Sequence, residues 1–276
     1  MRLSYQTITW GGVVGHPVGV TSIKDLFYEA NGSTERALRE IAAAGYEGVE
    51  IFDGNLRQFE GRPNDFRRLL ADTGLQLVAT YSGGNFIFPD ILDEELWRVD
   101  KAASLAAAFG AEHLVVGGGA QRSTGTVDAD YDRLGAALDS VVDIADRHGL
   151  RASYHPHLTT IVENPDQIDR IMAATRINLC PDTAHVTAGG GNPADVIRRY
   201  AGRVVYAHLK DFRADPFAFL PLGTGDVDFE GVLNALDAAG HDGWVSVELD
   251  SYEGDPAEPA RQSRAFLDDL VARRQR

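Results

Sequence analysis

The sequence predicts an α/β fold, a single (β/α)8 TIM barrel that takes up residues 1–276 as one domain. The first observation is an alternation, repeated eight times, of short apolar or β-branched runs with longer amphipathic segments. This alternation is typical of a parallel sheet with helical crossovers. The second is the length of 276 residues, because a barrel of this kind needs about 250 residues.

The strands are expected where the apolar runs lie, at residues 3–10, 48–52, 75–81, 113–117, 151–155, 177–181, 204–209 and 244–249. The helices are expected to begin near Thr34, Asn64, Asp93, Ala129, Pro165, Pro193, Phe229 and Pro256. Asn164 and Asn192 each stand directly before a proline, which is the pattern of a capping side chain followed by the first helical position. Glycines such as Gly45 and Gly149 close helices before the next strand.

A doubly wound open sheet is the main alternative architecture. Such sheets usually carry a glycine-rich phosphate-binding turn between the first strand and the first helix. Here Gly11, Gly12 and Gly15 follow the first strand but do not lead directly into a helical segment. The sequence therefore favours the barrel, with these glycines in a loop.

Composition narrows the class of function. The net charge of −15 opposes binding to nucleic acid, which requires lysine and arginine to displace counterions from phosphates. No run of eighteen apolar residues is present, so no membrane span is expected. The single cysteine, Cys180, cannot form an internal disulfide, and the N-terminal residues lack the pattern of a secretory signal. We therefore expect a cytoplasmic protein.

Ionisable residues gather where the last four predicted strands end. They are costly to bury unless they meet a metal, a charge or a substrate. In a barrel the C-terminal ends of all strands open at one mouth, so these side chains should become neighbours. The set comprises His155, His157, Asp182, His185, His208, Lys210 and Glu248.

A divalent metal is the ligand that this mouth is expected to hold. Glu163 lies in the loop after the fifth strand and joins Asp182, His208 and Glu248. Three carboxylates and one imidazole suit Mn²⁺, with Co²⁺, Mg²⁺ and Zn²⁺ as alternatives. Singly, Asp182 and Glu163 can each be explained by a favourable position near a helix N-terminus. Together the carboxylates would repel one another without a cation, which favours the metal.

Four residues are candidates for proton transfer beside the metal: His155, His157, His185 and Lys210. Histidine changes its charge near neutral pH, and Lys210 can hold a substrate oxygen or, with a depressed pKa, transfer a proton. Which histidine acts as the base stays open, and Glu248 is a further candidate. A metal at this place can polarise a ketone and stabilise the enediolate that forms when the α-proton leaves.

Four motifs resemble the xylose isomerase-like TIM barrel superfamily, over nearly the whole chain: PDTAH (181–185), AHLKD (207–211), GTGDVDF (223–229) and GWVSVELD (243–250). The segment YHPHLTTIVEN (154–164) is most similar to the inosose dehydratase and keto-sugar lyase branch. The resemblance implies metal binding by Glu163, Asp182, His208 and Glu248. Epimerases of the superfamily place a glutamate on the fifth strand, where this chain has Ser153, His155 and His157. That departure favours elimination over epimerisation.

The expected activity is a metal-dependent carbon–oxygen lyase that enolises a keto-sugar or keto-inositol and then eliminates the β-substituent, as a dehydratase or a 3-keto-glycoside-cleaving lyase. A sugar isomerase or epimerase acting through the same enediolate is the alternative, and a non-catalytic partner subunit is a further one. DNA repair nucleases of the superfamily need extra metal ligands and a DNA-binding surface, which this acidic chain does not supply. The expected partners are a small carbohydrate substrate and, in an oligomer, a second copy or another subunit.

Overall fold

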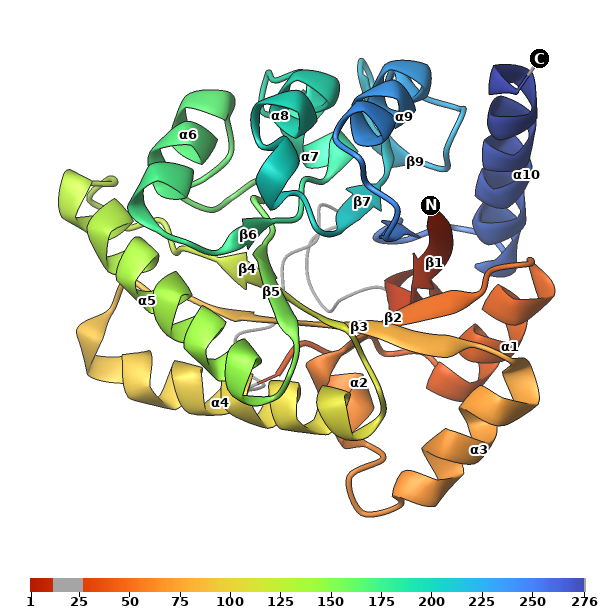
Figure 1. Ribbon diagram of the computed structural model, residues 1–276, viewed down its shortest axis with the longest axis horizontal. Helices are drawn as coiled ribbons and strands as arrows, with labels where there is room; N and C mark the ends of the chain where they lie inside the picture. Colours follow the sequence, from red (N-terminus) through yellow and green to blue (C-terminus); the bar gives the residue numbers. More distant parts are fainter. Residues whose placement is uncertain (12–26, 276) are drawn as a thin grey trace.

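The molecule is a nearly closed barrel of parallel strands surrounded by helices (Figure 1). The computed structural model describes residues 1–11 and 27–275. Gly12 and Gly15, which the sequence assigns to a loop, lie outside the described residues. The predicted fold class is confirmed.

Eight parallel strands form the barrel: β1 (Arg2–Gln6), β2 (Gly48–Phe52), β3 (Gln76–Gly84), β4 (His113–Gly118), β5 (Arg151–Tyr154), β6 (Asn178–Leu179), β7 (Ala207–Leu209) and β10 (Trp244–Val247). They pair in the order β6-β5-β4-β3-β2-β1-β10-β7. Two isolated parallel bridges, Leu179 to Val204 and Asp182 to His208, connect β6 to β7. The ring therefore brings the ends of β5, β6, β7 and β10 to one mouth.

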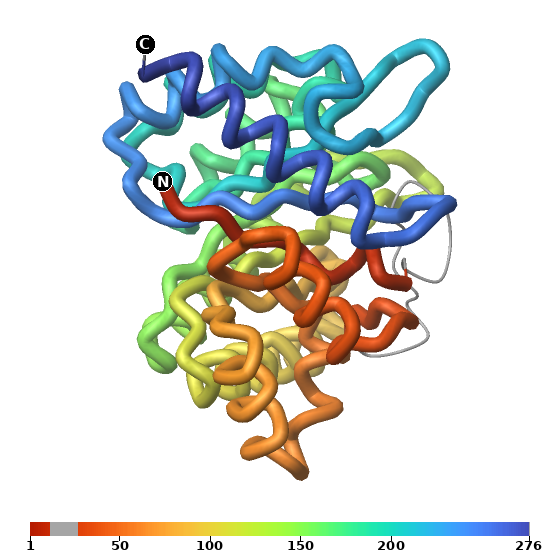
Figure 2. The backbone as a smooth tube through the Cα atoms, turned by 90° about the vertical axis from the view of Figure 1, so that its right-hand side faces the viewer, coloured from red at the N-terminus to blue at the C-terminus, as the bar shows by residue number. Residues whose placement is uncertain are grey.

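The helices lie outside the strands: α1 (Thr34–Ala43), α2 (Asp53–Arg57), α3 (Pro63–Thr73), α4 (Pro89–Ala108), α5 (Asp128–Arg147), α6 (Pro165–Ala174), α7 (Thr183–Ala188), α8 (Pro193–Arg199), α9 (Phe229–Ala238) and α10 (Ala257–Arg274). The asparagine caps are confirmed, because Asn164 accepts from the amide of Gln167 and Asn192 from that of Ala194. The C-terminal helix α10 lies beside β1 and α1 (Figure 1, Figure 2). None of the helices in these described ranges combines the length and apolar character needed to cross a membrane.

Strand alternation divides the buried side chains into two layers. On β4, Leu114 and Val116 belong to the large cluster between strands and helices, while Val115 belongs to a smaller cluster with Cys180 and Tyr206. Successive side chains of a strand point to opposite faces, so the smaller cluster fills the barrel interior. Polar side chains share that interior and become the functional site at its C-terminal end.

Several segments differ from the prediction, among them the short helices α2 and α7, which the sequence did not indicate. The first strand ends at Gln6 and continues as the 3-10 helix η1 (Thr7–Trp10), because the Gln6 side chain accepts from the amide of Ile8. Helix α4 begins at Pro89, four residues before the predicted start. The long segment after β7 is a hairpin of β8 (Asp211–Ala214) and β9 (Phe217–Leu220), followed by an ordered turn. Alternating phenylalanines and the turn at Asp215 and Pro216 were a signal for it.

Candidate active site

The mouth of the barrel gathers the ionisable strand ends that the sequence singles out. His155 follows β5, Asp182 follows β6, His208 and Lys210 lie on and after β7, and Glu248 follows β10. All five side chains are buried. Each element ends at the same rim, so residues up to 93 positions apart in the sequence become contacts.

Four of these side chains present one ligand atom each within 4.8 Å of one another: His155, Asp182, His208 and Glu248. Two imidazole nitrogens and two carboxylate oxygens at this spacing can hold a divalent cation. Asp182 has two roles here, because its Oδ1 also caps α7 by accepting from the amide of His185 at 2.7 Å. Asp182 can therefore cap α7 and also contribute an atom to a metal site.

Glu163 lies outside this four-residue group, in which His155 offers the atom from the end of the fifth strand. The Glu163 carboxylate accepts a short hydrogen bond from the amide of Thr159, a residue with φ of +68°, and a long one of 3.5 Å from the Gln121 side chain. It therefore stabilises the turn of its own loop.

His208 lies between two carboxylates. Its Nε2 donates to Glu50 Oε2 at 2.9 Å, and its Nδ1 lies 2.5 Å from Glu248 Oε2. Burial alone would lower the pKa of His208, but the two carboxylates outweigh it and raise that pKa well above its usual value. Without a metal, both nitrogens of this imidazole therefore carry protons.

Lys210 is a fully buried ammonium surrounded by acidic groups. Its Nζ lies 2.9 Å from Glu248 Oε1, 3.2 Å from Asp250 Oδ2 and 3.3 Å from Asp182 Oδ2. Burial would lower the pKa of Lys210, but these carboxylates raise it well above the usual value. The depressed pKa that the sequence left open is therefore absent, and Lys210 is positively charged at neutral pH.

The two carboxylates of the four-residue group have pKa values that are shifted in opposite directions. Burial raises the pKa of Asp182 to about 6, with Lys210 opposing it. Burial would also raise the pKa of Glu248, but Lys210 and His208 outweigh it and hold that pKa well below its usual range. Glu248 is thus firmly ionised at neutral pH.

A second group of side chains adjoins the first and consists of His155, His157 and His185. The rings of His157 and His185 lie 3.8 Å apart between centroids. Burial, the largest cause for each, lowers the pKa of all three, with positively charged or histidine neighbours adding to it. At neutral pH these imidazoles are uncharged and able to accept a proton.

Hydrogen bonds assign different tautomers to His157 and His185. His157 Nδ1 donates to the carbonyl of Leu158 at 2.6 Å, which leaves Nε2 with its lone pair. His185 Nε2 lies 3.2 Å from the Lys210 ammonium and accepts from it, which places the proton on Nδ1. Among residues 1–11 and 27–275, that Nδ1 has no hydrogen-bond partner. One ring therefore offers an acceptor and the other a donor.

The β8–β9 hairpin contacts this group at His185. The ring of Phe219 lies 4.9 Å from the His185 imidazole and 4.9 Å from Lys210 Nζ. Asp211, at the base of the hairpin, accepts from five backbone amides, those of Phe212, Gly223, Thr224, Gly225 and Val227. The GTGDVDF motif therefore has a structural explanation, since it wraps the loop around one buried carboxylate.

Glu50 is a site residue that the sequence reasoning missed. It lies in the middle of β2, fully buried, and contacts His208 across the barrel interior. The signal was a lone charged residue inside the apolar run GVEIF. An inward-facing glutamate in such a run needs a partner.

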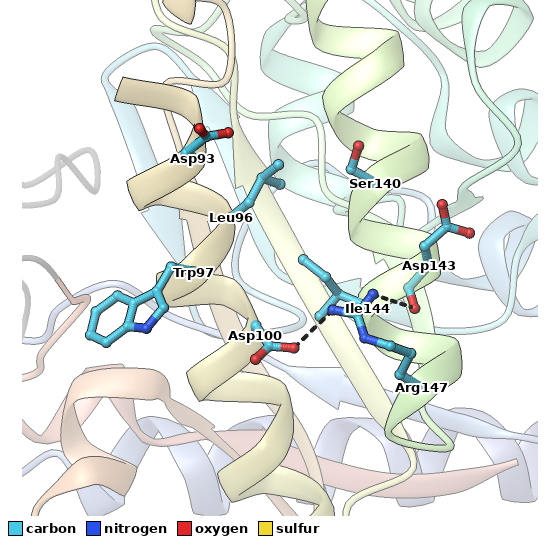
Figure 3. A pocket seen from close by; sticks show the side chains of 8 residues that line it. All are labelled: Asp93, Leu96, Trp97, Asp100, Ser140, Asp143, Ile144 and Arg147. Carbon is cyan, nitrogen blue, oxygen red and sulfur yellow. Dashed lines mark hydrogen bonds and ion pairs between the residues drawn. The ribbon is translucent and has the colours of Figure 1, made fainter. Parts of the chain in front are cut away.

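A pocket of about 380 Å³ lies elsewhere, between α4 and α5 on the outside of the barrel (Figure 3). It is lined by Asp93, Leu96, Trp97, Asp100, Ser140, Asp143, Ile144 and Arg147. An ion pair of Asp100 with Arg147 at 3.0 Å connects the two helices there. None of its lining residues belongs to the histidine and carboxylate groups at the barrel mouth.

Comparison with known proteins finds a similar curated sequence and solved structures of similar fold. Inosose dehydratase of Geobacillus kaustophilus is 28% identical over 86% of this chain and 87% of the relative. A solved structure of a probable 3-DHS dehydratase from Bacillus anthracis has a TM-score of 0.76 at 14% identity, covering 97% of this chain and 99% of that one. Another, described as IOLI protein with a binding zinc atom, has a TM-score of 0.75 at 18% identity and covers 99% of both chains.

The sequence model of one family, described as xylose isomerase-like TIM barrel, matches residues 38–270. That span is most of the chain and includes every residue of the mouth site. The resemblance carried by the PDTAH and AHLKD motifs is therefore confirmed. The chain belongs to the xylose isomerase-like TIM barrel family.

Proposed function

We propose that this protein is a divalent-metal-dependent dehydratase that removes water from a keto-inositol or a related keto-sugar. Support comes from the inosose dehydratase relative and from the group of four candidate ligands at the barrel mouth. Further support comes from the structurally similar IOLI protein, which is described with a binding zinc atom. The proposal places the enzyme in the cytoplasm and its substrate among small carbohydrates.

The residues present fit a divalent cation. The site contains four carboxylates and two positively charged groups. The carboxylates are those of Glu50, Asp182, Glu248 and Asp250, and the positive groups are the Lys210 ammonium and the His208 imidazolium. This group of six side chains thus carries a surplus of negative charge, which a cation would offset.

We propose His155, Asp182, His208 and Glu248 as the ligands, with His155 in the position first expected for Glu163. Two nitrogen ligands favour Mn²⁺, Co²⁺ or Zn²⁺ over Mg²⁺. Mn²⁺ is the first to test. When bound, the ion would supply Lewis-acid chemistry that polarises the ketone and offsets the negative charge developed after α-proton loss.

The observation that carries the proposal is the pair of opposite tautomers at His157 and His185. In the proposed reaction, His157 Nε2 takes the α-proton as the carbon–hydrogen bond breaks and a carbon–carbon double bond forms. The β carbon–oxygen bond then breaks, and His185 Nδ1 donates its proton to the departing hydroxide, which leaves as water. Lys210 replaces that proton through Nε2 of the same ring, so His185 stays uncharged.

The atoms balance in this scheme. The substrate loses one proton and one hydroxide, which together make the water released. The proton taken by His157 returns to Lys210 through solvent before the next cycle. Phe219 packs against the His185 imidazole, where it would exclude bulk water from the charged intermediate.

The experiment is product analysis of the purified protein with an inosose and added Mn²⁺. A product lighter by one water supports the dehydratase. A product of unchanged mass supports the isomerase or epimerase, and cleavage of a 3-keto-glycoside supports the related lyase. No turnover of any keto-sugar with any of the four ions would leave the non-catalytic subunit as the better account.

A further inference from the structure

The two nitrogens of His208 have contacts of different kinds. Nδ1 faces Glu248, a member of the ligand group, at 2.5 Å. Nε2 faces Glu50, which is outside that group, at 2.9 Å. The nitrogen directed toward the other candidate ligand atoms is therefore Nδ1. The opposite nitrogen, Nε2, is hydrogen-bonded to Glu50.

Glu50 reaches His208 across the barrel. Its neighbours on β2, Val49 and Ile51, belong to the cluster between strands and helices, so Glu50 points inward. Strand β7 pairs with β10 and bridges to β6, so it is not adjacent to β2 in the sheet. The contact thus connects two separated strands through the interior.

A stabilising role alone is a poor explanation for Glu50. The carboxylate is fully buried, and its Oε1 has no hydrogen-bond partner among the residues that the structure describes. Buried ion pairs often contribute no more stability than apolar side chains of the same size. A carboxylate that accepts from the second nitrogen of a metal-binding histidine, however, fixes both the tautomer and the orientation of the ring.

We propose that Glu50 is a positioning residue that holds His208 with its proton on Nε2 and its lone pair on Nδ1 directed at the metal. This inference rests on the proposed metal site. Glu50 touches neither the ion nor the substrate, and it acts through His208.

The test measures metal affinity of the full chain by calorimetry with Mn²⁺ and Zn²⁺, after chelator treatment. Glu50→Gln should stay within about threefold of the parent, because the amide oxygen still accepts from Nε2, whereas Glu50→Leu should bind about 10- to 100-fold more weakly. Asp130→Asn is the control. This substitution removes another fully buried carboxylate, which lies on α5 and forms ion pairs with Arg122 and Arg133. It should leave the metal affinity unchanged.

A second measurement does not depend on the variants folding. In the zinc-loaded parent protein, nitrogen NMR shifts of His208 should show Nδ1 bound to zinc and Nε2 carrying a proton. Binding through Nε2 would overturn the role of Glu50, as would equal affinity of Glu50→Leu and the parent protein. If the parent protein binds none of the ions, the proposed metal site and the role of Glu50 both fail, which separates that result from the other two.

Discussion

The Lys210 ammonium lies 2.9 Å from one oxygen of Glu248, while the other oxygen of that carboxylate faces His208 at 2.5 Å. Glu248 is therefore shared between the Lys210 ammonium and a candidate metal ligand. This arrangement keeps the carboxylate ionised in the interior and orients it toward the ligand group.

Replacing Lys210 by methionine should destabilise the metal-free protein by about 3–5 kcal/mol, because Asp182, Glu248 and Asp250 lose their shared buried counter-charge. Denaturant unfolding in the presence of chelator measures this loss. Added Mn²⁺ should restore part of it, since a cation would again offset the carboxylates. Lys101→Met, which alters an exposed lysine on α4, is the matched control and should change stability little. Equal stability of the two variants would contradict the account.

His157→Gln and His185→Gln should each lower kcat by about 10²- to 10⁴-fold while metal affinity stays near that of the parent protein. Neither residue belongs to the proposed ligand set, so the two readouts separate proton transfer from metal binding. Loss of the metal in either variant would assign that histidine to the ligands instead.

The pH profile of the parent protein gives an independent check on the base. The pKa of His157 is lowered by burial and by Lys210, so its base form persists below the ordinary histidine pKa. The rate should therefore stay level as pH falls through about 6.5, the ordinary histidine value. A rate that drops above that pH would contradict His157 as the base.

His113, at the start of β4, should make the fold sensitive to acid. Burial, with Arg151 adding to it, lowers its pKa to about 4, from 6.5 in the unfolded chain. Between these values the unfolded chain binds a proton that the folded protein does not. The free energy of unfolding therefore falls as pH drops from 6.5 through 4, by up to about 3 kcal/mol.

His113→Phe removes this titration and keeps a ring stacked on Tyr206, 4.9 Å away in the parent protein. Unfolding of both proteins at pH 7 and near the folded pKa gives the comparison, and the variant should lose less stability on acidification. The same loss in both proteins would assign the acid sensitivity to other groups.

Asp211→Ala should destabilise the protein by about 3–5 kcal/mol, because five backbone donors lose one charged acceptor. The hairpin that carries Phe219 should then lose its fixed position, which raises KM for the substrate. Asp226→Ala, at an exposed aspartate of the same loop, is the control. Unchanged stability and KM in Asp211→Ala would show that the hairpin is held by its phenylalanines instead.

The barrel could be predicted because three local signals indicated the same alternation of strands and helices. These are the spacing of apolar residues, the asparagines that cap helices and the glycines that end them. The mouth could be predicted in outline, since strand ends carried Asp182, His208 and Glu248. The position of Glu163 could not be predicted, because the path of its loop depends on the turn at Thr159 and not on spacing. The raised pKa of Lys210 depends on three carboxylates from other segments of the chain. The role proposed for Glu50 depends on its contact with His208 through the barrel interior. Such long-range contacts leave no periodic signal.

Metal content by mass spectrometry, after Mn²⁺ loading and desalting, tests the central claim most directly. The set comprises the parent protein, His155→Gln and Glu163→Gln. The account predicts about one ion per chain in the parent protein and in Glu163→Gln, and little in His155→Gln. Retention in His155→Gln with loss in Glu163→Gln would contradict the ligand set proposed from the structure. No ion in the parent protein would contradict the metal-dependent dehydratase itself.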